Sequence, residues 1–259
     1  MPYLKLQGRR INYQWYGETD LKRETAVFLH DGLGAIGSWK DIPEEIGRRA
    51  GINVLAYDRY GYGGSQPRGR FPLGFMEEEV PALVELLDAL SLDQAHLVGH
   101  SDGASIALLC AARYPARVCS LVSVAAHTFV EPQTREGIQA LVDSMNHGRI
   151  PAWLSRLHRE RAGPLLKAWG SGWLTARHAQ WNIESWLGYV KCPTLAIQGT
   201  ADEFGTEKQI IAIMNRVEGC ETWMVEGCGH TPYNEYPAAF AERVGGFLEK
   251  NLGDRFLDH

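Results

Sequence analysis

Short runs of hydrophobic residues alternate along the chain with longer segments in which hydrophobic residues recur every three or four positions. The short runs are rich in Val, Ile, Leu and Tyr, as buried strands are, and the longer segments have the spacing of helices. This alternation predicts an α/β fold, in which helices cover both faces of an eight-stranded, mostly parallel sheet. The first two strands are predicted to form a hairpin. Strands are predicted at residues 3–7, 9–16, 25–29, 53–57, 95–99, 120–125, 194–198 and 222–225.

One connection between strands is too long for a single crossover helix. Helix-like sequence fills residues 128–187, whereas the other predicted helices, at 39–50, 76–90, 103–114, 207–217 and 237–252, are short. We therefore predict that residues 128–187 form an inserted helical cap on a core made of residues 1–127 and 188–259. The cap holds five of the eight tryptophans, and we expect some to face a substrate pocket. They are Trp153, Trp169, Trp173, Trp181 and Trp186.

Composition and charge narrow the class of protein. The chain has 259 residues, 45% of them hydrophobic, and a net charge of −5 without long charged runs, so we expect no nucleic-acid partner. We find no apolar run of membrane-spanning length and no secretory pattern at the start of the sequence, which predicts a cytoplasmic protein without a membrane partner. Five cysteines without a Cys-x-x-Cys pair favour buried thiols over disulfides or a metal centre. No metal and no cofactor are expected.

The strongest chemical signal is Gly99-His100-Ser101-Asp102-Gly103, which follows one predicted strand and opens a predicted helix. Glycines on both sides of a serine permit a sharp, strained turn that projects the hydroxyl from the end of the sheet. A serine hydroxyl is a weak nucleophile, so it needs a histidine to take its proton and a carboxylate to orient that histidine. Ser101 is therefore the predicted nucleophile.

Position along the chain selects the partners of Ser101. His230 follows the last predicted strand and Asp202 follows the strand before it, so both are expected at the carboxyl edge of the sheet. Glu203 is the alternative acid. The order Ser101, Asp202, His230 is the nucleophile-acid-base order of a serine hydrolase triad. The histidines expected at the surface instead are His147, His158, His178 and His259.

An oxyanion hole requires backbone N–H groups aimed at the charge that develops on the substrate oxygen. Asp102 is expected to supply one from the start of its helix. The second is expected from the turn that begins at His30, with Gly32 as first choice and Leu33 as second. The alternative for this segment is an ordinary glycine turn.

These motifs together resemble the α/β-hydrolase superfamily over nearly the whole chain, including the run from Asp58 to Ser65. The aspartate after the serine resembles the biphenyl hydrolase-like and valacyclovir hydrolase branch of small serine esterases. That resemblance implies that Asp102 pairs with a substrate ammonium, whereas an aspartate in a first helical turn is also favoured by the helix dipole alone. The sequence departs from the superfamily at Asp31, where a glycine is usual, so Asp31 must point away from the oxyanion or be paired.

The predicted function is a serine hydrolase of small-molecule carboxylic esters, amides or lactones, with Asp102, Trp153 and Trp173 as candidate substrate-binding residues. Two alternatives remain open. One is hydrolysis of a carbon-carbon bond in ring-cleavage products, a reaction that uses the same triad on the same capped fold. The other is a weakly catalytic protein that binds ligands on the hydrolase scaffold. The sequence does not predict the oligomeric state.

Overall fold

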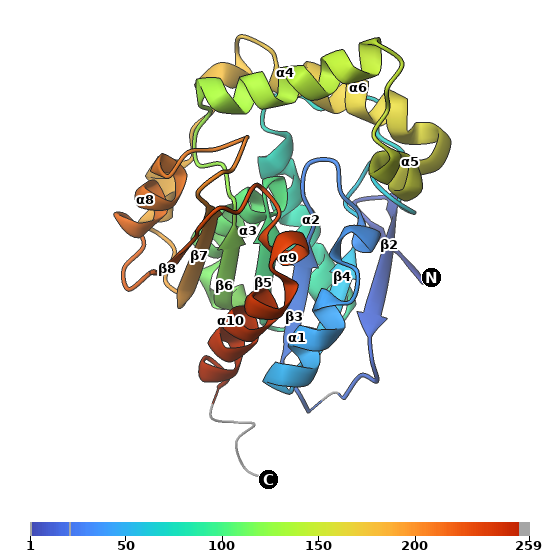
Figure 1. The fold of residues 1–259 in the computed structure, drawn as a ribbon. Helices are drawn as coiled ribbons and strands as arrows, with labels where there is room; N and C mark the ends of the chain where they lie inside the picture. Colours follow the sequence, from blue (N-terminus) through green and yellow to red (C-terminus); the bar gives the residue numbers. More distant parts are fainter. Residues whose placement is uncertain (1, 21, 254–259) are drawn as a thin grey trace.

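The computed structural model describes residues 2–20 and 22–253 and has the predicted eight-stranded sheet. The strand order is β1-β2-β4-β3-β5-β6-β7-β8, where only the pairs β1·β2 and β2·β4 are antiparallel. The α/β fold with a mostly parallel sheet is therefore confirmed (Figure 1). The strands are β1 Tyr3–Leu6, β2 Arg9–Tyr16, β3 Thr25–Leu29, β4 Asn53–Tyr57, β5 Ala95–His100, β6 Val118–Val124, β7 Thr194–Gly199 and β8 Glu221–Val225.

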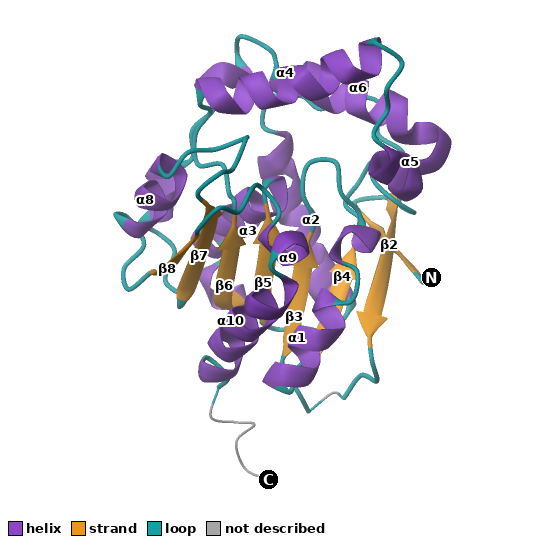
Figure 2. Ribbon diagram, in the orientation of Figure 1, coloured by secondary structure: helices purple, strands orange, loops and turns teal. Residues whose placement is uncertain are grey.

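Helices cover both faces of the sheet, as Figure 2 shows by colour. On one face, α1 (Ile42–Ala50) packs against α10 (Pro237–Lys250). Ile42, Ile46 and Ala50, spaced four residues apart on α1, are buried in the same hydrophobic cluster as the strands. On the other face, α2 (Phe75–Ala89) packs against α3 (Asp102–Arg113), and α8 (Lys208–Met214) adds Ile210 and Ile213 to the same hydrophobic cluster. The central strands are therefore buried on both sides.

The segment between β6 and β7 contains α4 (Pro132–Asn146), α5 (Ala152–His158), α6 (Ala162–Trp173) and α7 (Glu184–Leu187). In Figure 1, α4, α5 and α6 lie above the ends of the strands, away from the faces of the sheet. A β-bridge between Phe129 and Asn182 joins the two ends of the segment. The short α7 packs against α3 and α8 in the helix layer of the sheet.

Two histidines expected at the surface are buried, so those two predictions are wrong. His158 accepts a hydrogen bond from the Gly63 N–H through Nδ1, at 3.2 Å, and donates from Nε2 to the Leu33 carbonyl, at 2.8 Å. His178 stacks between aromatic rings below α6. The surface prediction is correct for His147, and His259 lies outside the described residues.

Smaller features complete the fold. Within residues 2–20 and 22–253, short 3₁₀ turns occur at Ile36–Trp39, Pro115–Arg117, Arg159–Arg161 and His178–Gln180. The short helix α9 (Pro232–Glu235) follows His230 and was not predicted, because four residues are too few for a helical period. All five cysteines are free, and Cys110 and Cys228 are buried while the other three are partly exposed. No described helix is long and apolar enough to cross a membrane.

Candidate active site

Ser101 occupies a sharp turn between β5 and α3. Its backbone has φ 54° and ψ −120°, a left-handed conformation that a residue with a Cβ adopts at a cost of about 1–3 kcal/mol. The flanking residues must be glycines because a side chain at either position would clash with the backbone. A Cβ on Gly99 would lie 2.5 Å from the Gly103 carbonyl oxygen, and a Cβ on Gly103 would collide with the Leu29 carbonyl. The Gly-x-Ser-x-Gly pattern thus has a steric cause, and the turn places Ser101 on the wall of a cavity.

Asp202 and His230 lie in the loops that follow β7 and β8. Both carboxylate oxygens of Asp202 are 2.9 Å from His230 Nδ1, and the carboxylate also accepts bonds from Gln198 Nε2 and the Phe204 N–H. The two loops meet because Gly199 has no Cβ; a Cβ there would collide with the Cys228 carbonyl. Ser101 and His230 line the same cavity, so the structure brings the three predicted residues to one site.

The electrostatics of this pair suit a general base. Burial alone would raise the pKa of Asp202, but the His230 ring and the Phe204 N–H lower it below its usual value, so the carboxyl stays ionised. For His230, burial alone would lower the pKa, and the Asp202 charge and hydrogen bond raise it above 6.5. The alternative acid, Glu203, contacts the backbone N–H of His230 at 3.2 Å and has no hydrogen bond to the ring.

The predicted oxyanion loop lies beside Ser101. Gly32 and Leu33 line the cavity, and the Leu33 N–H already donates to the Asp31 carboxylate, at 3.3 Å. In the described part of the chain, no hydrogen bond occupies the N–H of Gly32 or that of Asp102. These two groups are therefore the better candidates for donors to an oxyanion.

Asp31, the departure from the superfamily pattern, lines the cavity, and its Oδ2 accepts the Leu33 N–H. Its Oδ1 lies 3.9 Å from Nδ1 of His100. Burial would raise the pKa of Asp31, but the neighbouring His100 ring, followed by those of His30 and His230, lowers it below its usual range. Gly34 makes this position possible, because a Cβ there would overlap the Asp31 carboxylate. The loop that begins at His30 therefore carries a carboxylate at the cavity wall, near His100.

The three candidate substrate-binding residues lie in different surroundings. Trp153 lines the cavity and is 39% exposed. Trp173 is fully buried, lies outside the cavity lining and packs edge-on against His127. Asp102 is also buried and outside the lining: its Oδ2 accepts a bond from Trp169 Nε1, at 3.1 Å, and lies 4.0 Å from the Arg59 guanidinium.

The buried Asp102 carboxylate is only partly satisfied. No described residue donates a hydrogen bond to its Oδ1. Burial raises the pKa of Asp102 above its usual value, and the Arg59 charge offsets part of that rise. The carboxylate thus forms part of a buried charged group beneath Trp169, which itself lines the cavity.

The cavity has a volume of about 790 Å³, within the range of sites for small molecules. Ile138 and Leu141 from α4, Trp153 from α5 and Trp169 from α6 give it an apolar roof. His127 and Phe204 complete the walls beside His230 and were not predicted. The available signal was their position, because His127 follows β6 and Phe204 follows β7, so both lie in loops at the carboxyl edge of the sheet.

The comparisons with known proteins agree with this architecture. A family model described as the alpha/beta hydrolase fold matches residues 25–186. The serine hydrolase BPHL of Mus musculus is 26% identical over 94% of this chain and 84% of its own length. A 2-hydroxy-6-oxononadienedioate/2-hydroxy-6-oxononatrienedioate hydrolase of Paraburkholderia xenovorans is 27% identical over 90% of this chain and 89% of its own.

Among solved structures, an alpha/beta hydrolase from a Medee basin deep-sea metagenome library superposes with a TM-score of 0.78. It is 23% identical in sequence, and the match covers 98% of this chain and 99% of that one. A likeness at this identity supports the fold, and the family match covers more than half of the chain. The chain therefore belongs to the alpha/beta hydrolase family and is an enzyme of the hydrolase class.

Proposed function

We propose that this enzyme hydrolyses small-molecule carboxylic esters, amides or lactones through a Ser101-His230-Asp202 triad. The observation that carries the proposal is the hydrogen bond from the His230 ring to Asp202 at the wall of the cavity that Ser101 also lines. A histidine held through Nδ1 keeps Nε2 free to accept a proton. The relative named as a serine hydrolase, which matches almost the whole chain, supports the same chemistry.

In the proposed reaction, Ser101 Oγ attacks the carbonyl carbon of the substrate while His230 Nε2 takes the hydroxyl proton. The N–H groups of Gly32 and Asp102 stabilise the negative charge on the carbonyl oxygen, each by about 3 kcal/mol in the transition state. His230 then returns the proton to the leaving group, and an acyl-enzyme remains on Ser101. A water molecule, deprotonated by His230, releases the acid and restores the serine.

We further propose that the predicted cap, residues 128–187, limits substrate size through α4, α5 and α6, whereas α7 at its end belongs to the helix layer of the core. The roof of the cavity comes from α4, α5 and α6, and its apolar side chains suit an apolar acyl or leaving group. Trp153 is the exposed tryptophan of this roof and Trp169 the buried one. Trp173 has no contact with the cavity, so its proposed role is to support Trp169, whose ring centroid is 6.2 Å away.

A panel of p-nitrophenyl esters of increasing acyl length, with lactones and amino-acid amides, tests the function. We expect release of p-nitrophenol with a preference for acyl groups that fit the cavity, and a change of that preference in Trp153→Ala. A protein that only binds ligands would release no product. If no ester, amide or lactone is cleaved by well-folded protein, the proposal is wrong.

Carbon-carbon bond hydrolysis is the second candidate. Its support is the relative of Paraburkholderia xenovorans, which carries a ring-cleavage-product hydrolase name and matches most of the chain. Adding a vinylogous 1,5-diketone to the panel separates the two functions. Cleavage of that substrate with no activity on esters would favour this second candidate.

Asp102→Asn tests whether Asp102 recognises a substrate ammonium. Because the Asp102 side chain lies outside the cavity lining and contacts Trp169 and Arg59, we expect similar losses of kcat/KM on an α-amino ester and on its des-amino analogue. We also expect a lower melting temperature, since the buried Arg59 loses its nearby anion. A loss confined to the amino ester would instead assign ammonium binding to Asp102.

A further inference from the structure

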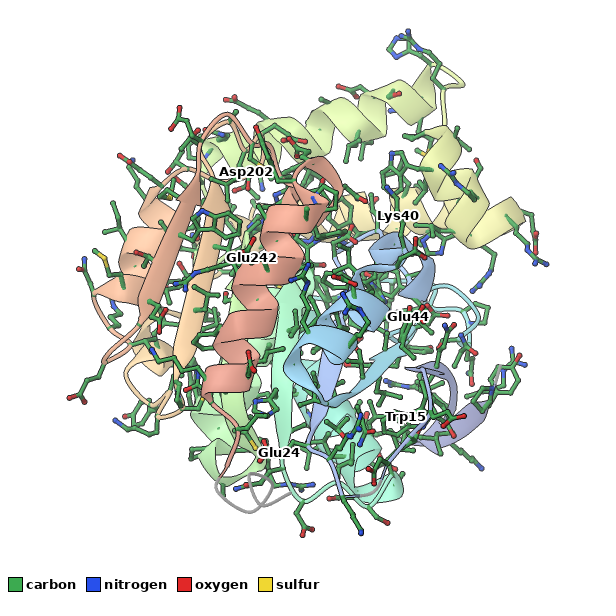
Figure 3. The ribbon with its side chains drawn as sticks, turned by 60° about the horizontal axis from the view of Figure 1, so that its bottom comes forward. Trp15, Glu24, Lys40, Glu44, Asp202 and Glu242 are labelled. Atoms are coloured by element: carbon green, nitrogen blue, oxygen red, sulfur yellow. The ribbon has the colours of Figure 1, made fainter. Side chains whose placement is uncertain are left out.

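A second group of chemically active side chains lies at the amino ends of the parallel strands, far from the cavity. Glu24 precedes β3, His96 is in β5 and Cys119 is in β6, and one ligand atom of each lies within 4.8 Å of the others. Figure 3 shows Glu24 and Asp202 toward opposite ends of the molecule. Since β5 runs from Ala95 to His100, His96 and Ser101 are separated by about 16 Å of extended chain.

The His96 ring is fully buried and held in a single orientation. Its Nδ1 is 2.7 Å from the Ser120 hydroxyl, and its Nε2 is 2.6 Å from Oε2 of Glu24. A separation of 2.6 Å is the distance of a hydrogen bond with one proton between Nε2 and Oε2, so a metal ion that binds both atoms must displace that proton. The other carboxylate oxygen, Oε1, accepts the Gly253 N–H at 2.8 Å, which keeps Oε2 turned toward the ring.

Cys119 adds a third donor of a different kind. A thiolate, an imidazole and a carboxylate together favour Zn²⁺, whereas Mg²⁺ and Ca²⁺ prefer oxygen ligands alone. Ligands of tetrahedral Zn²⁺ at about 2.0–2.3 Å lie roughly 3.3–3.8 Å apart. The ion would therefore replace the hydrogen bond between His96 Nε2 and Glu24 Oε2, whose 2.6 Å separation must open, while the Cys119 thiol moves closer. Burial raises the pKa of the Cys119 thiol to about 12, and a bound Zn²⁺ would displace its proton.

The Ser120 hydroxyl completes the arrangement expected around a metal-binding histidine. Such histidines use the second ring nitrogen in a hydrogen bond that fixes the ring and its tautomer. A simple Glu-His ion pair would explain the contact of Glu24 with His96, but it would not require a thiol from the neighbouring strand.

We propose that Glu24, His96 and Cys119 bind one Zn²⁺ ion, with a water molecule as fourth ligand. The ion would join three segments, the β2–β3 loop, β5 and β6, and through Glu24 the chain at Gly253. The ion would take no part in the reaction at Ser101, because the site lies at the opposite edge of the sheet. This site differs from the sequence-based expectation of no metal, which rested on the lack of a Cys-x-x-Cys pair.

The test uses untagged, chelator-treated protein titrated with ZnCl₂ against a chromophoric chelator. We expect one equivalent of Zn²⁺ per chain and a rise in melting temperature. Cys119→Ser and Glu24→Gln should each abolish tight binding, and Ser120→Ala should weaken it by roughly 10–100-fold. Cys220→Ser is the matched control, since Cys220 is partly exposed and outside the group, and should bind as the parent does.

Substitution with Co²⁺ gives an independent readout. A thiolate-to-cobalt charge-transfer band is expected in the parent and in Cys220→Ser, and it should be absent in Cys119→Ser. The proposal is overturned if the parent binds no stoichiometric Zn²⁺. It is also overturned if tight binding survives in either Cys119→Ser or Glu24→Gln, or is lost instead in Cys228→Ser, which would place the ion beside His230.

Discussion

Replacing Ser101 with alanine is expected to lower kcat/KM for p-nitrophenyl esters by about 10⁴-fold or more, because members of a triad act as a unit. Among the described residues that line the cavity, Ser101 is the one whose hydroxyl lies in the turn between β5 and α3. Alanine keeps the Cβ that the turn already accommodates, so backbone strain should not change. The melting temperature of Ser101→Ala should therefore equal that of the parent within a few degrees, as measured by circular dichroism.

Covalent labelling with a fluorophosphonate probe tests whether Ser101 is the nucleophile without the need for a substrate. The parent should be labelled at Ser101, and Ser101→Ala should not be labelled. Ser171→Ala is the matched control, because Ser171 is an exposed serine on α6 and its loss should change neither labelling nor turnover. Undiminished labelling of Ser101→Ala would remove this serine from the mechanism.

The central strands of the sheet were predictable because most of their residues are apolar. Strands buried on both faces favour apolar side chains, and Thr25–Leu29 and Asn53–Tyr57, each with one polar residue at its start, have the predicted bounds. Helix ends were predictable to within a few residues for a similar reason, since buried positions recur with the helical period. The exception is α9, which is too short to show a period.

The predicted site residues share one property: each is fixed by its order relative to a strand. Asp202 and His230 follow β7 and β8, and parallel strands bring such loops to one edge. Residues whose role depends on contacts distant in sequence escaped prediction. His158 is buried because Gly63 and Leu33, some hundred residues earlier in the chain, present backbone groups to its ring.

Asp102 and Trp173 show why side-chain direction is harder to predict than position. Asp102 follows Ser101, yet its carboxylate points under Trp169 to Arg59, since a helix turns successive side chains by about 100°. Trp173 is on the cap helix that carries Trp169, but it lies one turn further along and packs against His127. Proximity in sequence to a pocket residue was therefore a poor guide to pocket contact.

Asp202→Asn is expected to lower kcat/KM by about 10⁴-fold while leaving the fold intact, because the asparagine amide favours the wrong tautomer of the histidine. An amide N–H that donates to Nδ1 leaves the ring proton on Nε2. The protonated Nε2 then cannot accept the Ser101 proton. The parent carboxylate does the opposite, since it accepts the Nδ1 proton at 2.9 Å.

The pH dependence should change as well. In the parent, His230 must be neutral to act as base, so kcat/KM falls as the pH drops through a His230 pKa above 6.5. Burial lowers that pKa and Asp202 raises it, so without the Asp202 charge the pKa falls. The acid limb of the Asp202→Asn profile should therefore lie at lower pH than that of the parent, as measured for kcat/KM between pH 5 and pH 9.

Glu203→Gln is the matched comparison, because Glu203 also lies near His230 but binds only its backbone N–H. We expect a loss far smaller than that of Asp202→Asn and a small shift of the acid limb to lower pH, since the Glu203 charge also raises the His230 pKa. A severe loss in Glu203→Gln with near-normal activity in Asp202→Asn would assign the acid to Glu203. Equal and small losses in both would mean that His230 needs no carboxylate, which the triad mechanism does not allow.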